Sequence, residues 1–506
     1  MEEVYNYNVG VLGHIDSGKT SIVRVLSEVL STAALDKHPQ SAERKITLDL
    51  GFSAFRMPMP EKFGPGTLQI TLVDCPGHAS LIRTVIAGAS IIDKMLLVID
   101  ATKGVQTQTA ECIVIAELLI KGLLVVAINK VDLVEEKKLE ALEKKLRALF
   151  MKTRFKDKVA FVKVAAAPRS GDPIGAENLK STLVDSIEEL PDREVNEALY
   201  YAVDHCFPVK GQGTVMTGTI LQGSLKVGDT IEVLQLNVTK KIKSMQSFHK
   251  PISYAKKGDR VAVCVTQFDS KLIERGIVSR PNTLRLVSSC IIKVNPIQYY
   301  TYPIKTNSKH HITCGNETVM GSCVFFSCAN EESKSGEPFA HNFEPDLVYS
   351  YEETISLNQP KNYFALMTLD SPVCTLQGGV LIGSKLDLDT TTKKCRIAFA
   401  GVVEVIEPEV NCTYLKVSKP KERKGEVERI QDPYTAICKG MFHKESDLTK
   451  FQGLKVEVAG AIAYIQSSFG KSGKFKINFP EGNACMGEVV LRFKKLLWDN
   501  YHRLIQ

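Results

Sequence analysis

Residues 13–20 read GHIDSGKT, and this segment constrains the fold more than any other part of the chain. It follows the apolar run VGVLG and precedes residues 19–30, which have helical spacing, so it has the strand, loop and helix context of a phosphate-binding loop. The glycines let backbone amides close around phosphates, while Lys19 supplies a cation and Thr20 a hydroxyl for Mg²⁺. The segment alone predicts a site for a nucleoside triphosphate.

The rest of the first 191 residues alternates strands with helices. The runs VGVLG, LQITLVD, KMLLVID and LLVVAIN read as strands, and each precedes a helical stretch, at residues 19–30, 81–89, 107–120 and 135–150. The strands are almost entirely apolar, as expected when helices cover both faces of a parallel sheet. We therefore predict an N-terminal α/β domain.

Two further motifs stand at strand ends. DCPGH at residues 74–78 ends the second run, and NKVD at residues 129–132 ends the fourth. Asp74 can hold Mg²⁺ through water, Gly77 can donate its amide to the terminal phosphate, and Asp132 can accept both N–H groups that guanine has and adenine lacks. An unpaired carboxylate would cost about 1–3 kcal/mol with adenine, so the motifs together predict GTP. Asp74 or Asn129 alone would read as an ordinary strand-end turn.

Two residues are candidates for the hydrolytic step. His78 directly follows the DxxG turn and can orient or polarise the attacking water. Thr47, in KITLDLG, is a candidate second hydroxyl for Mg²⁺ on a loop that orders around the terminal phosphate. Taken by itself, a histidine at this position would more often be a surface residue.

After Pro191 the pattern changes to short β-branched runs separated by Gly and Asp turns. These runs predict one β-barrel followed by another from about Leu284. Residues 327–357 hold many acidic, Asn, Ser and Pro residues with little periodicity, which predicts a surface loop in the second barrel or a disordered linker.

Composition narrows the function only slightly. A net charge of +7 is too small to establish a nucleic-acid partner, although residues 401–506 contribute 17 Lys and Arg against 13 Asp and Glu. Basic residues there alternate with Phe442, Phe451, Phe469, Phe475 and Phe479, which predicts either an RNA-facing surface or a solvated surface over an ordinary β core.

The cysteines and the apolar runs bear on localisation. The 13 cysteines form no CxxC pair and suit reduced thiols rather than disulfides or zinc. No signal peptide and no run of about 18 apolar residues is visible, so we expect a soluble cytoplasmic protein without a membrane partner.

GHIDSGKT, DCPGHASLIRT and NKVD, in this order before two barrels, resemble the elongation factor Tu family of translational GTPases over about residues 4–400. Within that family, ITLDLGF, TLVDCPGHASLIRTVIAGASIID and VDHCFPVKGQGTVMTGTILQG look like the eukaryotic branch that carries selenocysteinyl-tRNA. The resemblance implies delivery of that tRNA to the ribosome at recoded UGA codons, with release on GTP hydrolysis.

The resemblance divides the chain into a GTP-binding domain (residues 1–194), β-barrel domain II (195–284), β-barrel domain III (285–403) and a mostly β domain IV (404–506). It implies that domain IV recruits the factor through the selenocysteine insertion element of mRNA and its binding protein. We also expect a monomer.

The site residues follow from the motifs and the resemblance. Catalytic roles fall on Lys19, Asp74, Gly77 and His78, and Mg²⁺ ligation on Thr20, Thr47 and Asp74. The residues expected to bind the nucleotide are Gly13, His14, Ile15, Asp16, Ser17, Gly18, Lys19, Thr20, Asp74, Gly77, Asn129, Lys130, Asp132, Ala165 and Ala166.

The resemblance also implies an aminoacyl pocket in domain II, formed by Asp204, His205 and Arg260 and closed by Phe52. A cationic pair of His205 and Arg260 would favour a selenolate over neutral serine by roughly 1.5–3 kcal/mol. The alternative is that Asp204 and Arg260 form an ordinary salt bridge of the barrel.

Two departures from the family pattern affect these expectations. Lys45 replaces the glycine of RGITLDLG, which puts the conformation of that loop in doubt. No lysine follows Ala165–Ala167 where the family has SAK or AAK, which predicts a weaker guanine contact.

Two alternative functions are a related GTPase that carries a different tRNA, and a metabolic GTPase subunit of the same architecture. A non-catalytic RNA-binding adaptor is a third, but it does not explain the intact Lys19, Asp74 and Asp132.

Overall fold

The computed structural model describes residues 4–30, 51–76, 91–120, 122–191, 197–315, 317–328, 342–357, 361–388, 394–407, 415–470, 472–498 and 504–505. It consists of two compact units. The first comprises Met1–Ile304, Ser308–Ser322 and Met367–Glu409, and the second Lys305–Asn307, Cys323–Leu366 and Val410–Gln506. The boundaries expected at residues 194, 284 and 403 stay predictions.

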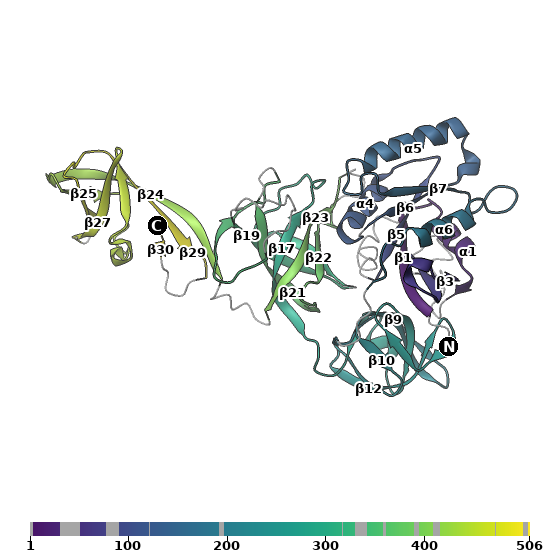
Figure 1. The fold of residues 1–506 in the computed structure, drawn as a ribbon. Helices are drawn as coiled ribbons and strands as arrows, with labels where there is room; N and C mark the ends of the chain where they lie inside the picture. Colours follow the sequence, from purple (N-terminus) through teal and green to yellow (C-terminus); the bar gives the residue numbers. More distant parts are fainter. Residues whose placement is uncertain are drawn as a thin grey trace. The chain divides into compact units, whose positions relative to one another are not determined.

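The first unit begins with an α/β domain, here called the G domain (Figure 1). Its seven-stranded sheet has the order β2-β3-β4-β1-β5-β6-β7. The strands are β1 Val4–Gly13, β2 Val29–Leu30, β3 Gly51–Pro58, β4 Thr67–Asp74, β5 Lys94–Asp100, β6 Leu124–Asn129 and β7 Val159–Val164. The helices are α1 Lys19–Leu26, α4 Thr107–Leu119, α5 Glu136–Phe150 and α6 Ala176–Asp185, with short 3-10 turns at η1 Glu61–Phe63 and η3 Val131–Leu133.

The sheet is mixed, whereas the sequence predicts a parallel one. β4, β1, β5, β6 and β7 are parallel neighbours, but β3 runs antiparallel to β4 and β2 antiparallel to β3. The difference arises because the short connection at residues 59–66 turns β3 directly back into β4, whereas a parallel neighbour needs a crossover.

One helix ends earlier than predicted. The periodicity predicts a helix over residues 19–30, but α1 ends at Leu26, Ser27 is extended with ψ 132°, and residues 29–30 form β2. The apolar face of α1 still packs with α6 in one core cluster against the sheet. The predicted helices at residues 107–120 and 135–150 are present as α4 and α5, and the one at residues 81–89 lies outside the described part of the chain.

The first barrel follows the G domain in the same unit. Its sheet has the order β11-β16-β8-β9-β15-β12-β13, and an additional β11–β12 pairing closes it, while β10 and β14 form a separate ribbon. The strands are β8 Tyr200–Val209, β9 Gly213–Gln222, β10 Ser224–Lys226, β11 Thr230–Val233, β12 Val238–Ser247, β13 Lys250–Ile252, β14 Tyr254–Lys256, β15 Arg260–Val265 and β16 Gly276–Ser279, with a 3-10 turn at η4 Ser270–Leu272.

The second barrel has strands in the order β18-β22-β23-β17-β21, and β18 also pairs with β19. The strands are β17 Leu286–Pro296, β18 Lys309–Cys314, β19 Glu317–Cys328, β21 Asn362–Cys374, β22 Val380–Ser384 and β23 Ile397–Glu407. β19 and β21 each run from one unit into the other along the chain.

The second unit contains the C-terminal barrel. Its order is β24-β25-β28-β27-β26-β29-β30, and a β24–β29 pairing closes it around its own core cluster. The strands are β24 Lys416–Asp432, β25 Thr435–Lys439, β26 Lys455–Val458, β27 Ala461–Phe469, β28 Lys474–Asn478, β29 Glu488–Leu496 and β30 Leu504–Ile505, with a 3-10 turn at η5 Leu448–Phe451. The predicted fold class, an α/β domain followed by two barrels and a mostly β C-terminal domain, is confirmed.

The prediction of a loop over residues 327–357 is wrong for part of that segment. Val348–Glu352 forms strand β20, which pairs with β19 and, in parallel, with the start of β24. Tyr349 is 1% exposed and lies 5.1 Å from Phe326 and 5.4 Å from Phe343, centre to centre. Its burial among aromatic rings fixes the strand despite the polar sequence around it.

The C-terminal aromatic residues also correct an expectation. Phe442, Phe451, Phe475 and Phe479 are buried in the core of the C-terminal barrel, so they do not form an RNA-facing surface. Phe469 stays partly exposed and lies beneath Arg429 and Lys476. The alternative prediction, basic residues over an ordinary β core, fits four of the five rings.

Candidate functional site

The predicted phosphate-binding loop, residues 13–20, joins the end of β1 to α1, the strand and helix context that the sequence predicts. Gly18 stands at the start of α1 with φ 90°, in the left-handed region that favours glycine. A Cβ at this position would lie 2.1 Å from Nδ2 of Asn129, which donates to the Ser17 carbonyl at 2.9 Å. The GKT and NKVD segments therefore meet, and glycine is required where they do.

Lys19 is the buried cation of this loop. Its ammonium donates to the carbonyl of Gly13 at 3.1 Å and to that of His14 at 2.8 Å. Burial lowers the pKa of Lys19, although the Asp74 charge opposes the shift. Burial and the neighbouring Lys19 also lower the pKa of His14. A phosphate would supply the negative charge that this ammonium favours.

The buried hydroxyl of Ser17 fits the same ligand. Its oxygen is shielded from solvent and has no hydrogen-bond partner among the described residues. Because a buried polar atom without a partner is costly, an additional group such as a phosphate oxygen would complete this loop.

Thr20 and Asp74 form an oxygen pair that suits Mg²⁺. The Thr20 hydroxyl donates to Oδ2 of Asp74 at 2.6 Å, and Asp74 is fully buried at the end of β4. Hydroxyl and carboxylate oxygens are the ligands that Mg²⁺ binds in proteins, usually with several waters. Among the described residues no group of three or more His, Cys, Asp and Glu forms a further metal site.

The residues predicted to read the base lie at the end of β6. Lys130 has φ 65°, and its ammonium donates to the Asp16 carbonyl at 2.6 Å and to Oδ2 of Asp100 at 2.7 Å. Burial opposes ionisation of Asp100, but hydrogen bonds from Lys130 and Thr102 outweigh it and lower the pKa of that carboxyl. Lys130 is therefore anchored to both the phosphate-binding loop and β5.

The loop after β7 lies against the same motif. The Ala166 amide donates to Oδ1 of Asn129 at 3.2 Å, and the Arg169 amide donates to Oδ2 of the exposed Asp132 at 3.4 Å. The weaker guanine contact expected from the missing lysine stays a prediction. Lys45, Thr47, Gly77 and His78 lie outside the described residues.

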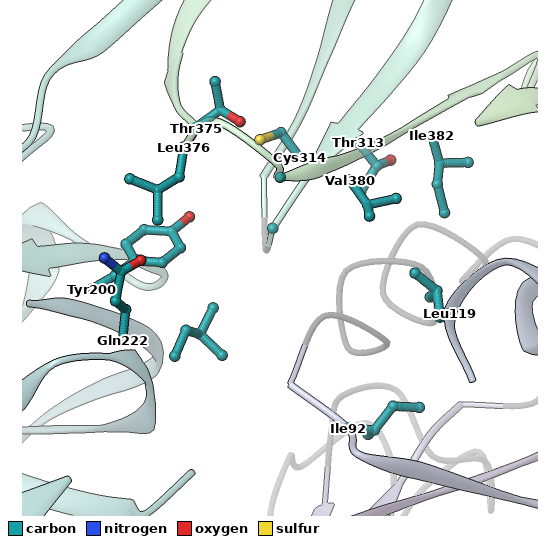
Figure 2. A pocket seen from close by; sticks show the side chains of 13 residues that line it. Ile92, Leu119, Tyr200, Gln222, Thr313, Cys314, Thr375, Leu376, Val380 and Ile382 are labelled. Carbon is teal, nitrogen blue, oxygen red and sulfur yellow. The ribbon is translucent and has the colours of Figure 1, made fainter. Parts of the chain in front are cut away.

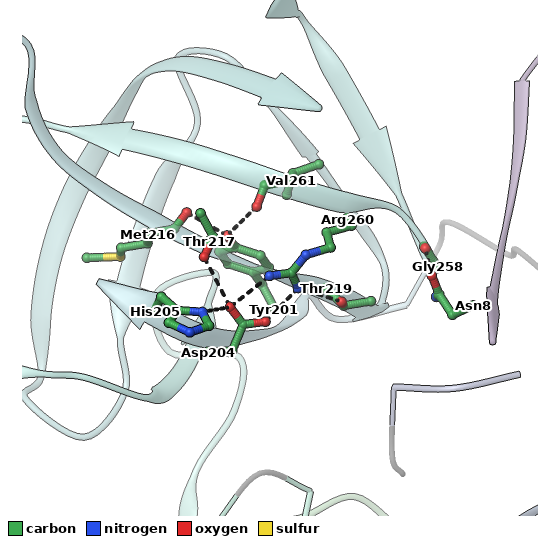
Figure 3. A network of polar contacts seen from close by, with 10 residues as sticks. All are labelled: Asn8, Tyr201, Asp204, His205, Met216, Thr217, Thr219, Gly258, Arg260 and Val261. Carbon is green, nitrogen blue, oxygen red and sulfur yellow. Dashed lines mark hydrogen bonds and ion pairs between the residues drawn. The ribbon is translucent and has the colours of Figure 1, made fainter. Parts of the chain in front are cut away.

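A second cluster of predicted residues lies in the first barrel (Figure 3). The Arg260 guanidinium donates to Oδ2 of Asp204 at 2.5 Å and to Oδ1 at 2.9 Å. Nδ1 of His205 lies 2.8 Å from the same Oδ1, and the Thr217 hydroxyl donates to it at 3.0 Å. The structure thus brings the three predicted residues together.

The charge of this cluster is compensated internally. Burial opposes ionisation of Asp204, but the Arg260 charge and hydrogen bonds from His205 and Arg260 hold its pKa well below the ordinary value. The side chains of Arg260 and Asp204 are 4% and 10% exposed, whereas that of His205 is 26% exposed. The geometry includes the salt bridge that the alternative prediction describes, and leaves the imidazole as the most accessible member.

Phe52 reaches this cluster from the G domain. It is fully buried at the start of β3, and its ring centre lies 3.0 Å from the Arg260 guanidinium carbon. An aromatic face attracts a cation, more strongly when both are desolvated. The predicted pocket residues therefore come from two folded parts of the first unit.

A separate cavity of about 310 Å³ lies elsewhere in this unit (Figure 2). Ile92 and Leu119 of the G domain line it, with Tyr200 and Gln222 of the first barrel and residues of the second barrel that include Thr313 and Cys314. None of its lining residues is charged or belongs to the predicted sites. It therefore does not suit a nucleotide phosphate or a selenolate.

Sequence reasoning missed three supporting residues. Gln108 of α4 accepts the Ile15 amide at 3.3 Å, Asp100 pairs with Lys130, and Thr217 donates to Asp204. Asp100 had a detectable signal, because it ends β5 beside Asn129 at the end of the neighbouring parallel strand. Gln108 and Thr217 become recognisable only when α4 and β9 are in place.

Known families match almost all of the chain. The model described as elongation factor Tu GTP binding domain matches residues 5–208, and that of elongation factor Tu domain 2 matches residues 213–278. The third domain of the eukaryotic selenocysteine-specific elongation factor matches residues 291–401, and the eEFSec C-terminal RIFT domain matches residues 413–500.

Curated relatives match over nearly the whole length. The selenocysteine-specific elongation factor of Mus musculus is 45% identical over 96% of this chain and 90% of its own length. The chain belongs to the family of selenocysteine-specific elongation factors. The factor of the same name from Methanocaldococcus jannaschii is 32% identical over 97% of this chain and 98% of its own.

A solved member of the family has the same fold. Translation elongation factor SelB from Methanococcus maripaludis, in complex with the GTP analogue GppNHp, has a TM-score of 0.74 and 27% identity, with 98% of this chain and all of that chain covered. As a member of this family with a match to the elongation factor Tu GTP-binding domain, the chain is a translational GTPase. Among the described residues, every helix is too short or too polar to cross a membrane.

Proposed function

We propose that the GTP-bound chain binds selenocysteinyl-tRNA, delivers it to the ribosome at recoded UGA codons, and is released when GTP is hydrolysed. The observation that carries this proposal is the buried Asp204–Arg260 pair with the accessible His205 beside it, in a member of this family. The names of the curated relatives and the solved GppNHp complex support the same reading.

The proposed aminoacyl pocket selects by charge. A selenol ionises more readily than a thiol or a hydroxyl, so selenocysteine carries a selenolate near neutral pH and serine stays neutral. Because Asp204 already pairs with Arg260, His205 would make the direct contact to the selenolate and Arg260 would supply a supporting positive field. One charge-assisted hydrogen bond would give about ten- to a hundredfold discrimination.

The G domain supplies hydrolysis. Lys19 would bind the terminal phosphates, the Gly77 amide would contact the last one, and His78 would orient or polarise the attacking water. The Thr20 hydroxyl and Oδ2 of Asp74, which lie 2.6 Å apart, would hold Mg²⁺ together with Thr47. When bound, Mg²⁺ neutralises charge that develops on the phosphate oxygens.

Guanine selection is assigned to the end of β6. Asp132 would accept the two guanine N–H groups, Asn129 would hold the loop that carries Ala165 and Ala166, and Lys130 would fix Asp16. Adenine would leave the Asp132 carboxylate unpaired, at a cost of about 1–3 kcal/mol.

Recruitment is assigned to residues 404–506. We propose that this part meets the selenocysteine insertion element of mRNA and its binding protein, and that the factor acts as a monomer in the cytoplasm. Because four of the phenylalanines are buried in the core, they cannot stack on RNA bases. The contact with the mRNA element would therefore rest on basic residues of the barrel surface, such as Arg429 and Lys476.

The cargo distinguishes this function from its rivals. Sequencing the RNA that copurifies with the GTP-loaded protein should return one tRNA species, the selenocysteine acceptor. An initiator or general elongator tRNA would contradict the proposal, and GTP hydrolysis that ribosomes do not stimulate would instead favour a metabolic GTPase subunit.

A further inference from the structure

Two asparagines of β1 contact the first barrel. Asn6 and Asn8 are two residues apart and so share one face of the strand. Asn6 Nδ2 donates to Oδ1 of Asp259 at 2.8 Å, and Asn8 Nδ2 donates to the Gly258 carbonyl at 3.1 Å (Figure 3 shows the second contact). Both contacts meet the turn directly before Arg260.

Asn6 is itself held by neighbouring strands of the G domain. Gln69 of β4 donates from Nε2 to Oδ1 of Asn6 at 2.6 Å, and Arg56 of β3 donates from Nε to Oε1 of Gln69 at 3.0 Å. These residues are direct register partners across β3, β4 and β1. Since the Asn6 oxygen already accepts from Gln69, its amide nitrogen is oriented to donate to Asp259.

The turn that receives these contacts is rigidly connected to the barrel. Asp259 Oδ2 accepts the Lys256 amide at 2.9 Å, the Gly258 amide donates to the Ile220 carbonyl at 2.7 Å, and the Ile220 amide donates to the Asp259 carbonyl at 3.0 Å. β15 starts at the next residue, Arg260. A shift of the turn would therefore move the Arg260 backbone.

Two side chains of β3 connect to Arg260 and to the turn before it. Phe52 and Arg56 are four residues apart on one face of the strand. Phe52 contacts the Arg260 guanidinium directly, and Arg56 reaches the adjacent Asp259 through Gln69 and Asn6. β3 begins at Gly51, four residues after Thr47, which is predicted to contact the nucleotide-bound Mg²⁺.

The hydrogen-bonded side chains of Arg56, Gln69, Asn6 and Asp259 are here called the polar ladder. We propose that the polar ladder positions Arg260. In this way the G domain would set the amino-acid selectivity of the first barrel. Asn6 is the central positioning residue of the ladder. This inference rests on the proposed function, because it takes the Asp204–His205–Arg260 cluster as the aminoacyl pocket. A displaced guanidinium would weaken binding of a selenolate and hardly affect neutral serine.

An exchange of the amide and the carboxylate between positions 6 and 259 tests the ladder. Asn6→Asp places a second carboxylate against Asp259 and should displace the turn. Combining it with Asp259→Asn restores a hydrogen bond of opposite direction, because the new amide can donate to the introduced carboxylate while its oxygen accepts the Lys256 amide. The Gln69 donor is satisfied in both variants. Asn178→Asp, at an exposed position of α6, is the matched control.

The readout is the dissociation constant of the seryl-tRNA divided by that of the selenocysteinyl-tRNA, here called the selectivity ratio. The same tRNA, charged with selenocysteine or with serine, is titrated against each GTP-loaded variant, and GTP affinity is measured separately. Asn6→Asp should lower the selectivity ratio by about tenfold, the loss expected from one broken charge-assisted contact. The double variant should recover to within about twofold of the original protein, and the control should not change. Asn6→Ala, which adds no charge, should lower the ratio by about threefold.

Three outcomes would overturn the ladder. The first is an unchanged selectivity ratio in both Asn6 variants. The second is an equal loss of affinity for both aminoacyl-tRNAs, which would mark a merely structural contact. The third is a double variant whose selectivity ratio stays as low as that of Asn6→Asp. If the original protein itself does not discriminate between the two tRNAs, the proposed pocket fails before any variant is compared. The two failures are therefore distinguishable.

Discussion

The Arg260 guanidinium carbon lies 3.0 Å from the centre of the Phe52 ring, while its nitrogens bind Asp204. Phe52 belongs to β3 of the G domain and Arg260 to β15 of the first barrel. The cluster proposed to recognise the amino acid is thus built jointly by the part that binds GTP and the part that would bind the cargo.

Replacing Phe52 should affect selectivity more than folding. Phe52→Leu keeps an apolar side chain but removes the aromatic face, so we expect the preference for selenocysteinyl- over seryl-tRNA to fall by about two- to thirtyfold, from a cation–π contribution of roughly 0.5–2 kcal/mol. Phe55→Leu makes the same change on the other face of β3, in the G-domain core. It should cost stability without altering the tRNA preference, and equal effects of the two variants on selectivity would contradict the role of Phe52.

Asp132→Asn should loosen the guanine preference. The amide reverses one donor–acceptor pair, so xanthine nucleotides should compete better and GTP should bind more weakly, by about 1–3 kcal/mol. Competition between GTP and XTP for the purified protein measures this. An unaltered preference for guanine would remove Asp132 from the base site.

His78→Ala should separate nucleotide binding from hydrolysis. We expect GTP affinity near that of the original protein and ribosome-stimulated hydrolysis slower by about 10²-fold or more, because a water-positioning group is lost. Single-turnover hydrolysis with saturating ribosomes is the measurement. An unchanged rate would rule out this role.

The buried pair between Glu111 of α4 and Arg396, next to β23, should be sensitive to removal of one partner. Its two bonds are both 2.8 Å, and the side chains are 4% and 5% exposed. Arg396→Met should cost about 3–5 kcal/mol in urea unfolding, whereas Glu111→Leu combined with Arg396→Met should recover most of it. Arg147→Met, which breaks the exposed Glu143–Arg147 pair, should cost less than about 1 kcal/mol. Similar losses in the two single variants would contradict the assignment.

His310 should make the second barrel sensitive to acid. Burial, followed by the nearby Lys385 charge, lowers the pKa of His310 to about 4 from 6.5. Between these values the unfolded chain binds a proton that the folded chain does not, so stability falls as the pH drops from about 6.5 to about 4, by up to about 3 kcal/mol. His310→Gln should flatten this part of the unfolding profile, and His443→Gln, an exposed control, should not. An equally steep profile in His310→Gln would contradict the prediction.

The placement of the predicted nucleotide-site residues could largely be foreseen because their signals are local. Gly18, Lys19 and Asn129 stand at strand ends or loop positions that the apolar runs already define, and parallel strands bring their carboxyl ends to one edge. The early end of α1 and the antiparallel β3 were not predictable from periodicity. They depend on Ser27 and on the turn at residues 59–66.

Contacts between distant segments were beyond the sequence. Asp204 and Arg260 were predicted as a pair from the family resemblance, but nothing in the residues indicated that Asn6 would meet Asp259 or that Tyr349 would be buried with Phe326. Such pairs depend on strand register and on barrel closure, which local patterns do not specify. The same holds for Phe475, whose basic neighbours suggested a surface position.

The most direct test of the whole account is a titration of the original protein with one tRNA, charged with selenocysteine or with serine, in the presence of a non-hydrolysable GTP analogue or of GDP. We predict a dissociation constant at least about tenfold lower for the selenocysteinyl form with the GTP analogue, and a loss of that preference with GDP. Equal affinity for the two charged tRNAs in the GTP-bound state would contradict the account.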